Sequence, residues 1–223
     1  CNDTSNCVTI TVDHVTAGTI AADQTICNNT IPAQLTGTTG TGDGVLTYKW
    51  LSNTTGCNGP WSPAAGTNTT QNYQPGALTV TTYYKRVTYS TLNGNVCNDT
   101  SNCVTITVDH VTAGTIAADQ TICNNTIPAL LTGTTGTGDG VLTYKWLSST
   151  TGCNGPWSPA AGTNNTQNYQ PGALTVTTYY KRVTYSTLNG TVCDDTSNCV
   201  TITVDHVTAG TIAADQTICN NTI

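Results

Sequence analysis

The 223-residue sequence contains no Glu, no Phe and no Met, and it has only six Lys plus Arg. Charged residues make up 8% of the chain, against roughly a quarter in an ordinary globular protein. The net charge of −6 leaves no basic surface for phosphate groups, which excludes nucleic acid and anionic membranes as partners. No run approaches the roughly 18 apolar residues of a membrane span, so we expect no membrane insertion.

What the sequence does contain is repetition with a period of 96 residues. The segment CNDTSNCVTITVDHVTAGTIAADQTICNNTI begins at Cys1, again at Cys97, and a third time at Cys193 with one change, Asn98 to Asp194. Near-identical copies in series are typical of chains that need length or many equivalent units, whereas an enzyme needs one catalytic site, so we expect no enzyme activity. Residues 1–96 and 97–192 differ at four places: Gln34/Leu130, Asn53/Ser149, Thr69/Asn165 and Asn95/Thr191.

The apolar residues are β-branched, aromatic or small, and they alternate with Thr between Gly, Pro and Asn turn signals. Val8, Ile10 and Val12 alternate with threonines in one clear strand, and residues 46–50 (LTYKW) form another, whose Trp resembles the core Trp of immunoglobulin-like sandwiches. Ile31, Ala33 and Leu35 are expected on one inward face, which leaves the Gln34/Leu130 position exposed. Strand 81–90 has two alternative inward faces, one with Tyr83 and Lys85 and the other with Tyr84 and Arg86. The sequence predicts an all-β chain of tandem antiparallel immunoglobulin-like β-sandwich repeats.

The natural phase of the repeat gives two complete domains, because the strand at Val104–Val108 closes the first copy. Junctions read VDHVTAG and are too short for independent tumbling of the neighbouring domains. The predicted divisions are 1–14, the last strand of a preceding repeat; 15–110 and 111–206, two immunoglobulin-like repeats; and 207–223, the first strand of a following repeat.

Cysteine recurs four times in each period, without any C-x-x-C pair typical of zinc sites. Disulfides in an oxidising compartment are therefore expected. Two pairings within a domain compete: Cys27–Cys97 with Cys57–Cys103, or Cys97–Cys103 with Cys27–Cys57. The disulfide candidates are Cys1, Cys7, Cys27, Cys57, Cys97, Cys103, Cys123, Cys153, Cys193, Cys199 and Cys219.

A His-Val pair follows Asp at each junction and predicts interdomain packing or capping. One His beside one Asp supplies too few ligands for a metal ion, and no dense Asp-x-Asp pattern supports calcium, so we expect no cofactor. No G-x-S-x-G or comparable catalytic pattern occurs. The predicted junction residues are His14, Val15, His110, Val111, His206 and Val207.

The runs AGTIAADQTIC, LTGTTGTGDG, YQPGALTVTTYYKRVTYSTLNG and SNCVTITV resemble the tandem immunoglobulin-like or PKD-like repeats of giant Bacteroidota surface adhesins, the type that includes gliding-motility adhesins. The resemblance covers essentially the whole repeat. It implies a type IX-secreted, cell-surface stalk made of many sandwich domains. Such repeats often carry Cys at positions matching Cys27 and Cys97, whereas Cys57 and Cys103 are additions here.

Two functions of different classes follow. The first is a structural stalk or filament segment of a secreted adhesin, located at the extracellular cell surface and stabilised by disulfides. The alternative is a multivalent module in which each repeat binds glycans or a surface weakly. For the stalk, the expected partners are neighbouring repeats of the same chain and laterally packed copies. For the binding module, they are surface glycans or substrata.

Overall fold

The computed structural model describes residues 1–220, which contain strands, turns and isolated bridges but no helix. These residues divide into two compact units. The first comprises Cys1–Thr112, Gly136–Leu142 and Tyr185–Asp195; the second comprises Ala113–Thr135, Thr143–Thr184 and the described residues from Thr196 onward. The all-β, immunoglobulin-like prediction is confirmed. Each repeat contributes one six-stranded sheet and a second, irregular layer.

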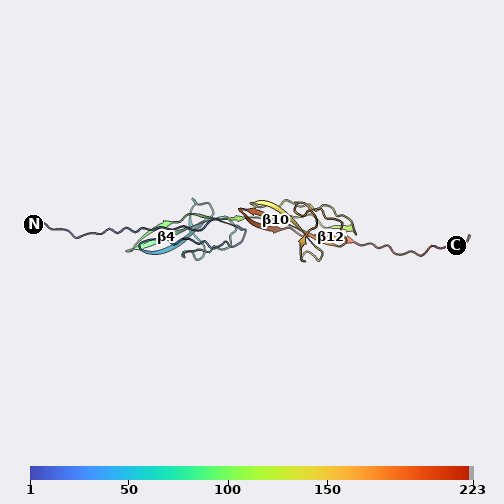
Figure 1. The fold of residues 1–223 in the computed structure, drawn as a ribbon, viewed down its shortest axis with the longest axis horizontal. Helices are drawn as coiled ribbons and strands as arrows, with labels where there is room; N and C mark the ends of the chain where they lie inside the picture. The colour runs from blue at the N-terminus through green and yellow to red at the C-terminus, as the bar shows by residue number, and fades with distance from the viewer. Residues whose placement is uncertain (221–223) are drawn as a thin grey trace. The chain divides into compact units, whose positions relative to one another are not determined.

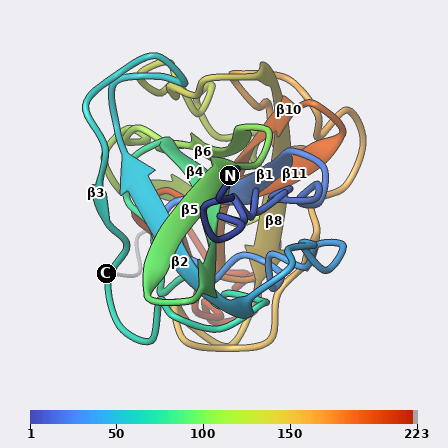
Figure 2. The same cartoon turned by 90° about the vertical axis from the view of Figure 1, so that its left-hand side faces the viewer.

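The first sheet has the strand order β1-β6-β4-β2-β3, with β5 also paired to β4 (Figures 1 and 2). Neighbours are antiparallel except β1 and β6, which run parallel. The bounds are β1 Gln24–Cys27, β2 Val45–Asn53, β3 Ser62–Pro63, β4 Thr82–Leu92, β5 Asn95–Thr100 and β6 Val104–Asp109.

The second sheet repeats this order as β7-β12-β10-β8-β9, with β11 paired to β10. The agreement follows from the near-identity of the two copies. Its bounds are β7 Gln120–Cys123, β8 Val141–Ser149, β9 Ser158–Pro159, β10 Thr178–Leu188, β11 Thr191–Thr196 and β12 Val200–Asp205.

Isolated bridges form the second layer of each sandwich. In the first repeat they join Thr16 to Thr41, Ile20 to Gly37, Thr30 to Leu78 and Leu35 to Tyr73. The core between the layers is built around Trp50, whose indole N–H donates to the Thr70 carbonyl at 2.9 Å. Its ring stacks on Tyr73 with centroids 5.6 Å apart, and the second repeat reproduces the pair with Trp146 and Tyr169. The core Trp predicted on strand 46–50 therefore anchors both layers.

Strand β4 resolves the two alternative faces of residues 81–90. Tyr84 and Arg86 point inward, while Tyr83 and Lys85 are half-buried on the opposite face. Lys85 Nζ lies 4.3 Å from the centroid of the Trp61 ring, which gives the ammonium a cation–π partner near solvent. Water can therefore reach the Lys85 ammonium on the outward face.

Arg86 is buried completely without a carboxylate partner. Its guanidinium donates to the carbonyls of Gln71, Ala17 and Thr38 at 2.9, 2.7 and 2.5 Å. The charge also lies 4.9 Å from the ring centroid of Tyr48. Burial lowers the pKa of Arg86. Three carbonyls accept from its two terminal nitrogens, while the buried Nε has no hydrogen-bond partner among the described residues. The guanidinium therefore reinforces three segments that are otherwise joined only by isolated bridges.

The closing strand of the sandwich is broken between β5 and β6. Ser101 lies in the break, donating its N–H to the Arg86 carbonyl and accepting from the Arg86 N–H at its hydroxyl, both at 2.9 Å. The side chain of Asn102 then bonds both the N–H and the carbonyl of Ile20, at 2.8 and 3.2 Å. Side chains in the break thus replace backbone pairing and fix the first segment of the repeat.

The identical VTITV sequences at 8–12 and 104–108 have different surroundings. Val104 is 1% exposed within β6, whereas Val8 is 79% exposed and residues 1–14 form no strand. The strand predicted at 8–12 is not formed, because β1 and β4 pair with β6 on its two sides and no described segment pairs with 8–12 in the same way. Residues 207–220 likewise form no strand, and the remainder of that predicted segment lies outside the described residues.

Candidate functional site: the cysteines and the Asp–His junctions

Three disulfides join six of the predicted cysteines. Cys57–Cys103 and Cys153–Cys199 are equivalent bonds within the two repeats, each with a sequence separation of 46. The third bond, Cys27–Cys193, has a separation of 166 and lies within the first compact unit. It joins a residue of the first repeat to a residue of the second. Its Cα atoms are 5.5 Å apart, the ordinary spacing for a disulfide.

Neither predicted pairing scheme describes Cys27. The Cys57–Cys103 bond belongs to the first scheme, but Cys27 bonds one period beyond Cys97. The sheet register gives the reason. Cys27 lies beside Asp109, three residues past the pairing of Ile106 with Thr82, whereas Cys97 lies opposite Ser90. About eleven residues of β4 separate the two levels, or roughly 36 Å at about 3.3 Å per residue, far beyond disulfide reach.

Hydrogen bonds surround the Cys27–Cys193 bond. Thr191 donates its hydroxyl to the Thr25 carbonyl, and the Asn189 amide donates to the Thr25 hydroxyl, both at 3.2 Å. Asn189 has a φ of 50° in the Asn-Gly turn that joins β10 to β11, a conformation Asn tolerates well. The turn of one repeat therefore holds the end of β1 of the other. The sequence marks the turn but gives no sign of what it contacts.

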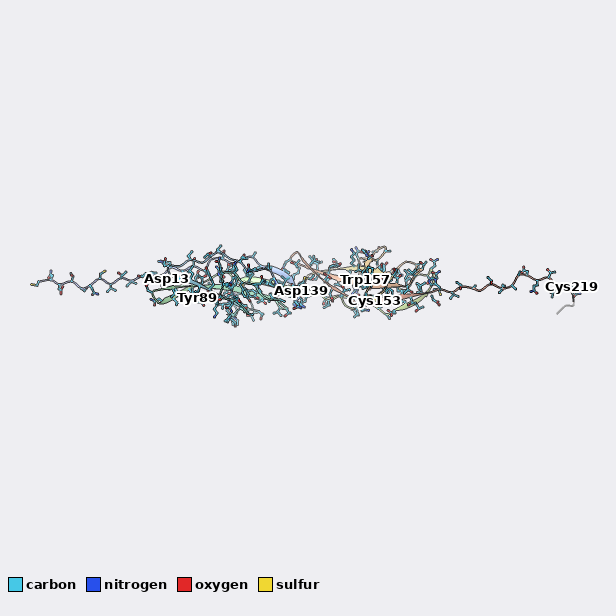
Figure 3. All side chains as sticks on the ribbon, turned by 90° about the horizontal axis from the view of Figure 1, so that it is seen from below. Asp13, Tyr89, Asp139, Cys153, Trp157 and Cys219 are labelled. Carbon is cyan, nitrogen blue, oxygen red and sulfur yellow. A yellow bond between two sulfur atoms is a disulfide. The ribbon has the colours of Figure 1, made fainter. Side chains whose placement is uncertain are left out.

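The other five cysteines are thiols. Cys97 is half-buried on β5, and Cys123 is exposed at the end of β7. The remaining three lie in the segments that form no strand, Cys1, Cys7 and Cys219, and Figure 3 labels the last.

Asp109 and His110 form the most connected junction. Asp109 is fully buried, and its carboxylate accepts from the Ser186 hydroxyl at 2.9 Å and from the Asp139 N–H at 3.2 Å. His110 donates its backbone N–H to the Asp139 carboxylate at 2.8 Å. Its Nδ1 lies 3.1 Å from the same oxygen, and its Nε2 lies 2.9 Å from the Thr79 carbonyl.

Both ring nitrogens of His110 face acceptors, so both must carry a proton when both bonds form. The carbonyl of Thr79 and then the carboxylate of Asp139 raise the pKa of His110 above its ordinary value of 6.5. The backbone N–H and ring of His110 lower the pKa of Asp139 below its ordinary 3.8. When His110 is protonated, the two side chains form an ion pair at the surface, with Nε2 donating to the Thr79 carbonyl.

The corresponding residues at the first junction make part of this arrangement. His14 bonds Asp43 through its N–H at 2.9 Å and its Nδ1 at 3.3 Å. Asp13, labelled in Figure 3, accepts from the Ser90 hydroxyl at 3.0 Å.

The junction valines differ more than the histidines do. Val15 and Val111 are half-buried, whereas Val207 is 81% exposed. His206, which precedes Val207, is also exposed. The valines are therefore partly covered at the first two junctions, whereas the histidines are exposed at all three.

Two hollows of the surface are shallow and lined by Thr and Gly together with one Ile and one Ala. They are equivalent and lie at Thr19 and Thr115 in the two repeats, beside backbone of the facing segment. Among residues 1–220 no three His, Cys, Asp or Glu side chains lie close enough to hold a metal ion. Within the same residues, no helix has the length and apolarity needed to cross a membrane.

The sequence matches the family described as "Domain of unknown function (DUF8696)" at residues 16–110 and again at 112–206. The chain belongs to this family. It holds two tandem copies of the DUF8696 domain, each with its own immunoglobulin-like core and its own internal disulfide. No curated protein is similar to it in sequence.

Solved structures with similar folds are tandem immunoglobulin-domain proteins of low identity. Extracellular domains 3–5 of Drosophila OTK are 12% identical, with 84% of this chain and 60% of that one covered and a TM-score of 0.41. Domains A168–A170 of titin are 13% identical over 86% and 68% of the two chains, with a TM-score of 0.40. The insect immune protein hemolin is 12% identical over 89% and 52%, with a TM-score of 0.36. The chain thus spans less than two thirds of OTK and hemolin.

Proposed function

We propose that this chain is a load-bearing stalk segment of a repetitive, secreted cell-surface adhesin, without catalytic activity. The observation that carries the proposal is the Cys27–Cys193 disulfide, which joins two successive repeats. Tension applied to the ends enters through residues 1–27 and leaves through residues 193–223. Residues 28–192 form a loop closed by the bond, so they bear no end-to-end load while it is intact.

The pairing of β1 with β6 supports the same function. β1 lies near the start of the first repeat and β6 at its end, and the two strands run parallel over four residue pairs. While the Cys27–Cys193 bond is intact, β6 lies inside the closed loop and carries no load. Once that bond is reduced, pulling the ends of the repeat apart loads the hydrogen bonds of this ladder together, in shear. Bonds loaded together resist more force than bonds that open one after another, which is the property a stalk domain needs.

The wider setting is part of the proposal. Structural disulfides persist in oxidising compartments, which favours an extracellular location. Resemblance of the repeat to giant Bacteroidota adhesins favours a cell surface and a role in adhesion or gliding motility. Few charges permit close lateral packing of several chains into a filament. Neighbouring repeats, rather than a small molecule, are the proposed partners.

Small-angle scattering of the oxidised chain tests the stalk proposal. We expect a narrow distribution of maximum dimensions, and a broader one for the double variant Cys27→Ser/Cys193→Ser. The matched control is Cys57→Ser/Cys103→Ser, which leaves the link between repeats in place. An equally broad distribution for the oxidised chain would mean beads on a flexible string. Saturable binding of the isolated chain to immobilised glycans would instead favour the multivalent binding module.

A further inference from the structure

A groove lies beside the thiol of Cys97, within the first compact unit. One wall is the segment 9–13 and the other is the hairpin between β4 and β5. The lining is polar on both sides: Thr9, Thr11, Asp13, Leu92, Asn93, Asn95 and Cys97. Neither wall carries a ladder partner along this side, since residues 1–14 form no strand.

The same position one period later is filled. Residues 105–109 correspond to 9–13 and pair in parallel with β1, from Gln24 opposite Ile106 to Cys27 opposite Asp109. The turn at Asn189 corresponds to Asn93 and bonds Thr25 from the other side. Cys193, which corresponds to Cys97, forms the disulfide to Cys27 and is only 1% exposed. Residues 105–109, the turn at Asn189 and Cys193 together hold β1, and we call this arrangement the filled seat. The occupant is the strand Gln-Thr-Ile-Cys.

We propose that the groove beside Cys97 binds a Gln-Thr-Ile-Cys strand from a further copy of this repeat, and that the cysteine of this strand bonds to Cys97. The strand runs parallel to residues 9–13, as β1 does along β6. Asn93 supplies the amide that Asn189 supplies in the filled seat, and Asn95 presents an amide donor where Thr191 presents a hydroxyl. Cys123, exposed at the end of β7, has the position of Cys27, and since β7 already pairs with β12, the proposed partner of Cys123 is the hairpin cysteine of a further copy.

The bond forms by oxidation of two thiols. Cys97 and the cysteine of the strand each lose a proton, one S–S bond forms, and two electrons leave. A low-molecular-weight disulfide such as oxidised glutathione accepts them through thiol–disulfide exchange, and its own S–S bond breaks to give two thiols. Half-burial of Cys97 makes the strand, which brings its sulfur into the groove, a better partner than a freely diffusing thiol.

In an array of repeats this rule gives every repeat one link on each side. A covalent route then enters at Cys97 of one repeat, follows the chain to Cys123 of the next, and crosses from there to the repeat that follows, in the manner of Cys27–Cys193. The stretch from Cys97 to Cys123 is about 27 residues, which reach roughly 90–100 Å at about 3.3–3.6 Å per residue. One such segment spans two periods of the sequence, so the oxidised array cannot be pulled beyond roughly 90–100 Å for every two periods.

A synthetic peptide tests the groove directly. The decapeptide Ala-Ala-Asp-Gln-Thr-Ile-Cys-Asn-Asn-Thr, which occurs at 21–30 and 117–126, is incubated with the full chain and a glutathione redox buffer. Digestion before Asp separates the thiols, and mass spectrometry counts the peptide adduct on each. We expect at least tenfold more adduct on Cys97 than a scrambled peptide with Cys at the same place gives, a factor that corresponds to about 1.4 kcal/mol of binding.

The exposed thiols of the same chain are internal controls. Random oxidation would label Cys1, Cys7 and Cys123 ahead of the half-buried Cys97, and this distribution would overturn the proposal. Equal labelling by the scrambled peptide would overturn it as well. Asn93→Gly removes the amide but keeps a residue suited to the φ of 50°, and should lower the adduct several-fold. Asn95→Thr restores the residue of the filled seat and should leave it unchanged.

Discussion

The Cys27–Cys193 bond sets how far the chain can be stretched. The shortest covalent path between the ends uses only residues 1–27 and 193–223. At about 3.3–3.6 Å per residue, the roughly 58 residues of this path reach roughly 200 Å, whereas all 223 residues without disulfides reach roughly 770 Å. Unfolding of both sheets cannot lengthen the oxidised chain beyond the shorter limit.

The double variant Cys27→Ser/Cys193→Ser separates this bond from the other two. Cys57–Cys103 and Cys153–Cys199 stay intact, and each removes the residues inside its loop, with a separation of 46, from the path between the ends. The roughly 130 residues that remain reach roughly 460 Å, more than twice the reach of the parent chain. The difference arises from connectivity alone and does not depend on the strength of any weak interaction.

Single-molecule force spectroscopy, with handles at both ends, measures these lengths. We expect a total contour length of roughly 200 Å for the oxidised chain, roughly 460 Å for the variant, and roughly 770 Å for either chain after reduction. If the oxidised parent chain instead extended as far as the variant, Cys27 and Cys193 would not be joined, and the load-bearing argument would fail with them.

Three further predictions concern stability. Cys57→Ser/Cys103→Ser should lower the free energy of unfolding of the first repeat by about 4 kcal/mol, the chain-entropy value for a loop with a separation of 46. A urea titration in which the unfolding midpoint of the variant did not shift would disprove this. Arg86→Ala should lower the free energy of unfolding of the first repeat by about 3–5 kcal/mol, because it leaves buried carbonyls without donors. Arg182→Ala should have the same effect in the second repeat. A loss below about 1 kcal/mol for both variants would count against the hydrogen-bond network. His110→Ala should lower the stability of the fold most between pH 3.8 and 6.5, where His110 and Asp139 are both charged. The loss should become smaller as the pH rises through the raised pKa of His110 or falls through the lowered pKa of Asp139. Thermal melts that show the same loss at every pH would contradict this.

The fold was predictable because the local pattern and the global architecture agree. Alternation of Val, Ile and Tyr with Thr gives strands, and the Trp of 46–50 lies in the core as expected. Alternation alone could not choose the inward face of β4, since each face carries a cation. Three carbonyls within reach of a planar guanidinium decide in favour of Arg86, a tertiary fact with no local signature.

Another prediction failed at the start of the second layer. Ile31, Ala33 and Leu35 were expected on one inward face, but Ile31 is exposed and the neighbouring Pro32 is buried, while Leu35 lies in the core as predicted. The segment has isolated bridges instead of a regular ladder, so the two-residue period does not hold across it. The Gln34/Leu130 difference falls at exposed positions, as the sequence predicted.

The cysteine connectivity could not be predicted because the repeat itself conceals it. Cys97 and Cys193 have almost the same neighbours in sequence, so no local pattern distinguishes a partner in the same repeat from one in the next. The sheet makes the choice. In a sandwich that the chain enters at one end and leaves at the other, Cys27 and Cys97 lie at opposite ends, and only a further copy brings a matching cysteine within reach of either. Cysteines placed at opposite ends of a repeated domain therefore link domains into a chain, whereas a pair such as Cys57 and Cys103 stabilises a single domain.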